Sequence, residues 1–413
     1  MNKRVMELKG VEVWDGNMAN SQALRQADVD VVAAYPITPS TATVENYAMF
    51  HANGYIDGEV MMTESEHAAM SACVGAGAAG GRVATATSSQ GLALMIEVLY
   101  QASGMRIPVV LCLVNRALAA PLNVNGDHSD LYLTRDSGWI SIDAFSPQEA
   151  YDMTLMSFKI SEHPDVRLPV ISNQDGFMTS HTAQNVTPLK DDVACKFVGD
   201  YLQVNALLNF DKPVTHGVQT EQDWHFEHKA KQHAALMGSK KVILETFAQF
   251  KELTGREYKL VESYNLENAD IAIVCLGTTY ETAMLAIEQL KAEGINAGVV
   301  APRVFRPFPL EEVAEALQNV KAIACMDRSA PGGTVGTLFN EISGALINTP
   351  ARPLMSNLIY GLGGRDMTVA ALKDIFRTLD KEAKEGKLSG KIQRFVGVRG
   401  PELSFYDVIG DAK

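Results

Sequence analysis

Short apolar runs alternate with amphipathic stretches along the first half of the chain. The apolar runs predict strands at residues 29–34, 82–87, 108–114 and 166–172. Apolar residues spaced three or four apart predict helices at 17–27, 42–52, 68–81, 92–101 and 146–163. Strands and helices that alternate in this way are typical of a parallel sheet with helices on both faces.

The alternation stops between residues 182 and 270 and then resumes. The interruption contains a polar stretch at 211–224 and a long helical run at about 226–253, where His225, His228 and His233 indicate a solvated helix face. After residue 270, strands are predicted at 271–276, 296–300, 322–326 and 354–360, with helices at 281–293, 309–317, 336–346 and 367–379. We therefore expect an α/β protein with two doubly wound parallel-sheet domains, residues 1–255 with an irregular C-terminal extension and residues 256–413.

The helix at 68–81 is unusual because it has no charge and almost no bulk. Small residues allow a helix to approach neighbouring backbone closely, so we expect tight packing. Two carboxylates, Glu64 and Glu66, precede this helix. Glu64 fits the ordinary role of an acid at a helix N-terminus. Glu66 borders the apolar run directly, and a carboxylate at such a boundary can exchange a proton near neutral pH.

Polar loops follow the predicted strands at 35–41, 88–91, 115–116 and 175–177. In a parallel sheet these loops share one edge, which is where open α/β sheets bind ligands. Two prolines restrict the backbone around Thr38, and Ser40 or Thr41 is a candidate cap for the next helix. The backbone N–H groups at 88–91 could cradle an anion, although this loop lacks the lysine of a P-loop.

Arg116 ends an apolar strand and therefore needs an anionic partner. Its planar guanidinium suits a carboxylate, either that of a ligand or that of a nearby acid such as Asp127 or Asp130. Those two acids are equally placed to hold Arg135. Together with His128 they could also suggest a metal, but one histidine and two carboxylates in a loop seldom make a metal site alone.

The composition argues against several classes of protein. The 413 residues suffice for two or three domains, and 46% apolar with 21% charged residues is an ordinary globular balance. A net charge of −13 without a basic cluster argues against nucleic-acid binding. Five scattered cysteines without a Cys-x-x-Cys pair argue against zinc or iron–sulfur ligation and favour the cytosol. The sequence shows neither a signal peptide nor a membrane span.

In their order and spacing, these stretches resemble the α subunit of pyruvate:ferredoxin oxidoreductase, from the thiamine-diphosphate-dependent 2-oxoacid:acceptor oxidoreductases. The similarity extends over nearly the whole chain. The matching stretches are Tyr-Pro-Ile-Thr-Pro-Ser at 35–40, Ser-Glu at 65–66, Thr-Ser-Ser-Gln-Gly-Leu at 87–92, Asn-Arg-Ala-Leu-Ala-Ala at 115–120, Gly-Asp-His at 126–128, Asp-Gly-Phe at 175–177, Val-Phe-Arg-Pro-Phe at 304–308 and Asp-Arg at 327–328.

The resemblance implies a fold and a role for each polar loop. The first domain would be a pyrimidine-type thiamine-diphosphate-binding domain, and the second a transketolase C-terminal-like domain. Glu66 matches the glutamate that contacts the pyrimidine ring nitrogen of the cofactor, and Thr38 and Arg116 match residues that hold the substrate carboxylate. The resemblance also places the cofactor near Tyr35, Pro36, Ser89 and Gln90.

Some parts of such an enzyme are missing from the sequence, which has neither a Gly-Asp-Gly motif for Mg²⁺ and diphosphate nor cysteines for a cluster. The resemblance therefore implies a complex. A β subunit would supply Mg²⁺ and the other half of the thiamine diphosphate site. Further γ and δ subunits would carry the 4Fe–4S clusters that pass electrons to ferredoxin or another acceptor.

The expected reaction is oxidative decarboxylation of a 2-oxoacid to an acyl group on coenzyme A and CO₂. Pyruvate is the first choice, and a branched-chain or aryl 2-oxoacid such as phenylglyoxylate stays open, since Pro121, Asn123 and Val124 could shape that pocket. A non-catalytic scaffold and a transketolase-like carboligase are the competing interpretations. The presence of both Glu66 and Arg116 argues against the scaffold.

Overall fold

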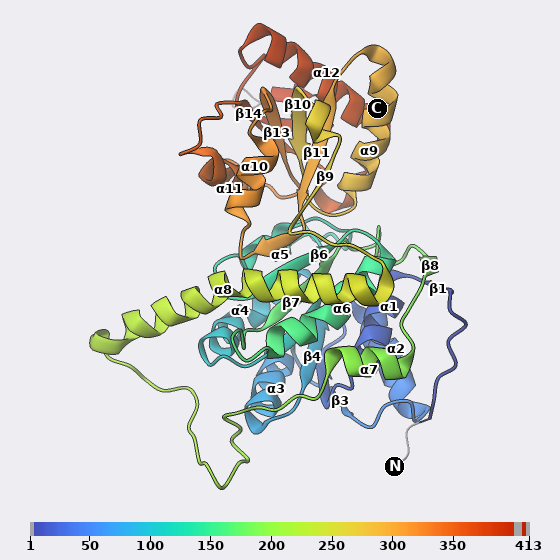
Figure 1. Cartoon of the computed structure of the whole chain (residues 1–413), viewed down its shortest axis with the longest axis vertical. Coiled ribbons are helices and arrows are strands. Elements are labelled where there is room, and N and C mark those ends of the chain that lie inside the picture. Colours follow the sequence, from blue (N-terminus) through green and yellow to red (C-terminus); the bar gives the residue numbers. More distant parts are fainter. Residues whose placement is uncertain (1–3, 400–406, 410–413) are drawn as a thin grey trace. The chain divides into compact units, whose positions relative to one another are not determined.

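The computed structural model describes residues 4–399 and 407–409, and the chain divides into two compact units. The first unit contains the chain up to Asn125 and Asp130–Tyr258, and the second contains Gly126–Ser129 and the chain from Lys259 onwards. Each unit has a sheet of mostly parallel strands covered by helices (Figure 1). Within the described residues, no helix is long and apolar enough to cross a membrane.

The sheet of the first unit contains parallel strands in the order β6-β7-β5-β4-β2-β3. The bounds of these strands are β2 (Val31–Ala34), β3 (Glu59–Met62), β4 (Val83–Thr87), β5 (Val109–Val114), β6 (Ile140–Ala144) and β7 (Val170–Gln174). The chain passes from β2 to β3 on one side and then to β4 on the other. The strand order therefore reverses at β2, and ligands bind beside such a reversal in open α/β sheets.

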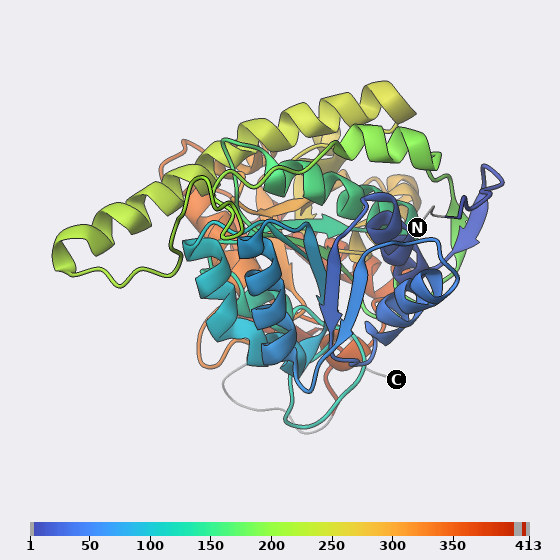
Figure 2. The same cartoon turned by 90° about the horizontal axis from the view of Figure 1, so that it is seen from below.

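Helices cover both faces of this sheet, which explains why β4, β5, β6 and β7 are buried along their full length. The covering helices are α1 (Gly16–Gln26), α2 (Thr41–Ala52), α3 (Glu66–Ala79), α4 (Ser89–Gly104) and α6 (Pro147–Glu162). Helix α1 packs with α2 and α6, whereas α3 packs with α4. Figure 2 shows the pair α3 and α4 on one side of the strands and α1 with α2 on the other.

The end of the first unit departs from this layered pattern. Strand β8 (Gln184–Val186) pairs antiparallel with β1 (Glu12–Trp14), and α7 (Asp191–Val198) leads to an irregular segment. The helix α8 (Gln222–Thr254) then packs against α6 and α4, its buried apolar side chains lie in its second half, and its first half extends away from the sheet (Figure 1). Large exposed apolar side chains gather on this segment and the first half of α8, namely Leu202, Leu208, Phe210, Val218, Trp224 and Phe226.

The three histidines of α8 are exposed, as the sequence predicted for a solvated helix face. The second half of the same helix differs, because Val242, Ile243, Phe247 and Phe250 are buried. The helix is thus solvated at its start and part of the core at its end.

The second unit has the strand order β16-β15-β14-β13-β10-β11-β9, parallel except for β9. The strands are β9 (Val261–Tyr264), β10 (Ile271–Val274), β11 (Ala297–Pro302), β13 (Ala322–Asp327), β14 (Leu354–Ile359), β15 (Gln393–Val396) and β16 (Asp407–Ile409). Its helices include α9 (Thr279–Leu290), α10 (Leu310–Leu317), α11 (Thr337–Leu346) and α12 (Val369–Glu385). An apolar core joins α9 and α12 to β10, β11 and β13.

The predicted fold class, two α/β sheet domains, is confirmed. Some short strands were not predicted, among them β3, β6, β9 and β15. The cap prediction for α2 is wrong in detail. Ser40 occupies the N-cap position, but its hydroxyl donates to the carbonyl of Ile37 at 2.8 Å instead of capping the helix.

Candidate functional site

The loops after β2, β4, β5 and β7 meet at one edge of the first sheet. The Arg116 guanidinium donates to the carbonyl of Thr38 at 3.0 Å, which joins the loop after β5 to the loop after β2. The Ser89 hydroxyl donates to the carbonyl of Ala117 at 2.6 Å. A Cβ on Gly176 would lie 2.0 Å from the carbonyl oxygen of Asn115, so the loop after β7 also lies directly against that after β5. The predicted grouping of these loops is confirmed.

Glu66 begins α3, and the two candidate carboxylates differ sharply in burial. The hydroxyl of Ser65 caps the helix by accepting from the N–H of Ala68 at 3.1 Å. Glu66 is only 7% exposed, whereas Glu64 is exposed. A Cβ on Gly91 would lie 2.7 Å from the Glu66 carboxylate oxygen. The glycine in α4 therefore leaves the room that the buried carboxylate occupies.

The small residues of α3 serve two different faces. Gly77 is buried, and a Cβ there would lie 2.5 Å from a methyl group of Ile107. Ser71 and Gly75 are exposed, and no heavy atom lies within 4 Å of a Cβ built on Gly75. The expected tight packing therefore holds for one face of the helix only.

Arg116 is 7% exposed, yet its guanidinium bonds only to backbone carbonyls. Besides the bond to Thr38, it donates from Nε to the carbonyl of Asn123 at 3.1 Å. Among the residues that the structure describes, no carboxylate lies within ion-pair distance of it. Asp130 accepts from the backbone N–H of Arg116 at 2.9 Å rather than from the side chain. The structure therefore shows no ion pair between Arg116 and Asp127, Asp130 or another described acid, and a buried positive charge of this kind suits an anionic ligand.

The other candidate residues divide into an exposed group and a buried one. Tyr35, Pro36, Thr38 and Gln90 are exposed, so their side chains are accessible from outside this chain. Ser89 is fully buried and has a φ of +50°, in the left-handed region that residues other than glycine seldom adopt. Its backbone is thus held in place by the surrounding loops.

The acids after Arg116 do not form a metal site in the described part of the chain. Nowhere among those residues do three or more His, Cys, Asp or Glu side chains come together as metal ligands. Asp127 accepts from the N–H groups of Ser129 at 3.0 Å and Gly363 at 3.1 Å. Arg135 bonds to the neighbouring Asp136.

Some buried polar atoms have no hydrogen-bond partner among the described residues, and several of them lie at the ends of β4, β5 and β7 or in the segments that follow these strands. They belong to Thr87, Ser88, Asn115, Gln174 and Thr179. Such atoms are rare in folded proteins and often mark the position of a ligand or an ordered water. Ser88 and Asn115 lie in polar loops that the sequence predicted at this edge, whereas Gln174 and Thr179 were not singled out as site residues.

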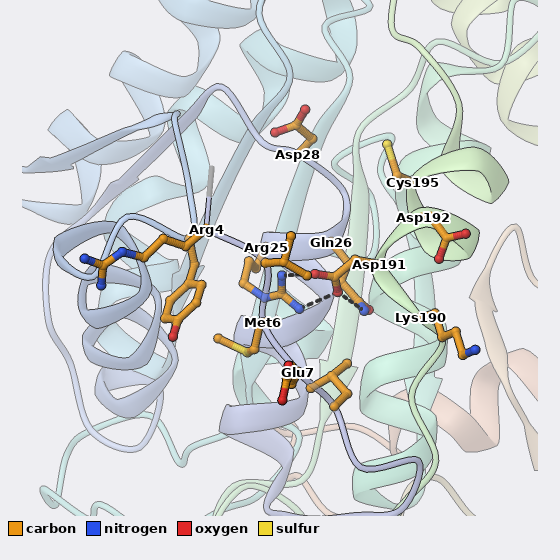
Figure 3. A pocket seen from close by; sticks show the side chains of 13 residues that line it. Arg4, Met6, Glu7, Arg25, Gln26, Asp28, Lys190, Asp191, Asp192 and Cys195 are labelled. Carbon is orange, nitrogen blue, oxygen red and sulfur yellow. Dashed lines mark hydrogen bonds and ion pairs between the residues drawn. The ribbon is translucent and has the colours of Figure 1, made fainter. Parts of the chain in front are cut away.

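A cavity of about 720 Å³ lies elsewhere in the first unit (Figure 3). It is lined by residues 4–8, the end of α1 and the start of α7, including the exposed Cys195. Arg25 forms two bonds with Asp191 there, at 2.7 and 2.6 Å, and Gln26 donates to the same carboxylate. Because α1 ends here before β2 begins, the cavity lies at the opposite edge of the sheet from the loops above.

Two family models match the chain. Residues 22–248 match one described as "pyruvate flavodoxin/ferredoxin oxidoreductase, thiamine diP-binding", and residues 269–372 match "pyruvate:ferredoxin oxidoreductase core domain II". The chain belongs to the pyruvate:ferredoxin oxidoreductase family. Apart from Gly126–Ser129, the first matched region lies in the first unit, and the second matched region lies in the second unit.

Curated members of this family are similar over most of their length. The pyruvate synthase subunit PorA of Thermotoga maritima is 43% identical, over 96% of this chain and 100% of that protein. PorA of Methanocaldococcus jannaschii is 44% identical, over 92% and 97%. The ketoisovalerate oxidoreductase subunit VorA of Pyrococcus abyssi is 40% identical, over 94% and 98%. Relatives named for two different 2-oxoacids are thus about equally similar to this chain.

Solved structures support the fold of this family member. A 2-oxoglutarate:ferredoxin oxidoreductase from Magnetococcus marinus, solved with 2-oxoglutarate, coenzyme A and succinyl-CoA bound, has a TM-score of 0.70 at 21% identity. The match covers 91% of this chain and 66% of that one. A split-gene transketolase has a TM-score of 0.52 at 13% identity, over 90% and 99%. At these identities the likeness shows the fold alone.

Proposed function

We propose that this chain is the α subunit of a 2-oxoacid:acceptor oxidoreductase that transfers the acyl group to coenzyme A. In this proposal it holds the pyrimidine half of thiamine diphosphate and the carboxylate of the 2-oxoacid. Two findings support this proposal together. The chain belongs to the family, and polar loop residues are grouped at one edge of the first sheet. Bound thiamine diphosphate would supply the nucleophilic carbon and the electron sink that decarboxylation of a 2-oxoacid requires.

The single observation that carries the proposal is that the buried guanidinium of Arg116 has no carboxylate partner among the residues the structure describes. A buried charge is costly unless it is paired, so an arginine in this position is best explained by an anion that arrives as a ligand. The carboxylate of a 2-oxoacid matches the planar fork of the guanidinium. Thr38, whose carbonyl already bonds to Arg116, would bring its exposed hydroxyl to the same substrate group.

Glu66 would bind the cofactor at its pyrimidine ring. Its carboxylate is buried against Gly91, where water is largely excluded, and it can hold or release a proton at one of its oxygens. The unpartnered hydroxyls of Thr87 and Ser88 add polar atoms at the same edge, which suits a heterocycle rich in nitrogen. Tyr35, Pro36, Ser89 and Gln90 would complete this half of the cofactor site.

The remaining parts of the enzyme would come from other chains. The relatives are named as subunits, which implies partner chains. We infer a β subunit that holds Mg²⁺ and the diphosphate, γ and δ subunits with 4Fe–4S clusters, and ferredoxin or another electron acceptor, all in the cytoplasm. The exposure of Thr38 and Gln90 supports a site that a second chain completes.

Pyruvate is the first choice of substrate, because PorA proteins are among the most similar relatives. A branched-chain 2-oxoacid is the second candidate, because a VorA protein is 40% identical over nearly the whole chain. The two substrates share the 2-oxoacid group, whose carboxylate Arg116 would bind. They differ only in the side chain, so kcat/KM of the assembled complex for pyruvate and for 2-ketoisovalerate distinguishes them.

The variant Glu66→Gln tests the proposal in the assembled complex. Loss of a group that moves a proton should lower turnover by about 10²–10⁴-fold while assembly is preserved. The matched control is Glu64→Gln, which removes an exposed carboxylate two residues away and should change turnover little. Hydrogen–deuterium exchange at C2 of the bound cofactor measures the step directly. A normal exchange rate in Glu66→Gln, or an equal loss in Glu64→Gln, would show that Glu66 is not the acting acid.

A further inference from the structure

A fully buried carboxylate, Asp130, connects the loops of the candidate site. It lies in the short helix α5 (Ser129–Leu133) and is 0% exposed. One of its oxygens accepts from the backbone N–H groups of Ser89 and Arg116, both at 2.9 Å. The other accepts from the side-chain amide of Asn115 at 2.9 Å. One side chain therefore bonds to the first residue of α4, which directly follows the turn after β4, and to the loop after β5.

These bonds act on backbone atoms whose positions matter for binding. Ser89 has a left-handed backbone, and the bond from its N–H to Asp130 favours that conformation. The N–H of Arg116 is fixed in the same way, and from this position its guanidinium reaches the carbonyl of Thr38. The Ser89 hydroxyl adds a further link by donating to Ala117, the residue that follows Arg116.

We propose that Asp130 is a positioning residue, which holds Ser89 and Arg116 in the arrangement that binds cofactor and substrate. The inference rests on the proposed function, because it assigns a purpose to the geometry of those two residues. Asp130 touches neither ligand in this scheme. It acts through charge-assisted hydrogen bonds, which are shorter and stronger than neutral ones and therefore suited to fixing two loops.

Replacement of Asp130 by asparagine preserves the shape of the side chain and removes its charge. Each carboxylate oxygen accepts from more than one N–H donor, since Leu131 also donates to the oxygen that Asn115 contacts. In Asp130→Asn, whichever way the amide turns, its NH₂ group faces N–H donors and cannot accept from them. At least one loop therefore loses its anchor.

In the assembled complex, we expect Asp130→Asn to lower kcat/KM for the 2-oxoacid by about 10–100-fold, the range that small displacements of a binding group produce. The loss should appear as a raised KM and a raised Kd for thiamine diphosphate, because both loops move. The matched control is Asp152→Asn, another fully buried carboxylate of the first unit, which bonds to Arg256 and Tyr258 away from the site. It should lower the melting temperature but leave kcat/KM within about twofold.

A purely structural role for Asp130 predicts a different result, namely that both aspartate variants lower the melting temperature and neither changes KM or the cofactor Kd. That result would overturn the proposal. If Asp130→Asn does not assemble, Asn115→Ala decides, because it removes a single donor and should raise KM by about two- to tenfold. An unchanged KM in Asn115→Ala would then contradict it. Arg116→Lys in the same assay reports on the proposed function itself, so the two failures can be told apart.

Discussion

The proposed binding of the substrate carboxylate by Arg116 and Thr38 can be tested one side chain at a time. Arg116→Lys retains the positive charge but loses the fork that binds two carboxylate oxygens. Loss of a charged hydrogen bond costs about 1.5–3 kcal/mol, which corresponds to roughly 10–150-fold in kcat/KM. We expect this loss for the 2-oxoacid with the Kd of thiamine diphosphate unchanged. Thr38→Val should give a smaller loss of the same kind.

The measurement is kcat/KM beside the cofactor Kd, both in the assembled complex. If Arg116→Lys preserves kcat/KM, then the guanidinium serves only to bond the carbonyls of Thr38 and Asn123. If Arg116→Lys raises the cofactor Kd together with KM, then Arg116 contributes to binding of the cofactor as well as of the 2-oxoacid.

The sequence predicted a candidate site residue where its position beside an apolar run was enough to single it out. It did not predict residues whose role depends on contacts between distant segments. Glu66 and Arg116 stood out because each borders an apolar run, and both are buried in the structure. That no described carboxylate pairs with the Arg116 guanidinium could be seen only in the folded structure. The contacts of Asp130 were not predictable, because its partners are mainly N–H groups, which every residue except proline carries.

Two glycines of α4 allow a test of how this helix packs. A Cβ on Gly91 would lie 2.4 Å from the Thr87 hydroxyl and 2.7 Å from the Glu66 carboxylate, whereas nothing lies within 4 Å of a Cβ on Gly104. We expect Gly91→Ala to destabilise the chain by about 1–3 kcal/mol and to reduce turnover by displacing Glu66. Gly104→Ala should stabilise it by up to about 1 kcal/mol.

Chemical denaturation of the two variants measures both free energies of unfolding. Equal and small effects would show that α4 can shift away from Glu66 at little cost, and that the close approach at Gly91 has no functional consequence.

The elements that were missed share a physical cause. Strand β6 reads Ile-Ser-Ile-Asp-Ala, and its polar residues are buried, with Asn173 of β7 donating to Asp143. Strand β3 is the outer strand of its sheet, and Met61 and Met62 are exposed. The spacing of apolar residues identifies a helix or strand only if the buried side chains are apolar and the exposed ones are polar. It fails where buried side chains are polar or exposed ones apolar.

At the scale of the whole molecule, the chain should bind neither thiamine diphosphate nor iron on its own. Its sequence has no diphosphate motif, the described residues contain no group of metal ligands, and Tyr35, Thr38 and Gln90 lie open on the surface. Isothermal titration calorimetry of the isolated chain should therefore give no binding heat for the cofactor. Micromolar binding by this chain alone would contradict the shared site, and the assembled complex is the positive control.

The layered architecture of both units followed from the apolar pattern, but the structure of the segment before α8 and of the start of α8 did not. Leu208, Phe210, Trp224 and Phe226 are apolar and exposed, so their spacing does not report a core within this chain. The spacing of apolar residues predicts secondary structure on the assumption that these residues are buried within their own chain. The assumption does not hold for this stretch, where large apolar side chains are exposed.

The cysteines have a practical consequence. Burial raises the pKa of the Cys73 and Cys112 thiols to about 12, and raises that of Cys325 well above its ordinary value. Cys275 is buried as well, so Cys195 is the one exposed thiol among the five, all of which are described. A maleimide dye would therefore attach at a single point, beside the cavity formed with residues 4–8. The natural sequence thus carries its own site for a fluorescent reporter of the N-terminal segment.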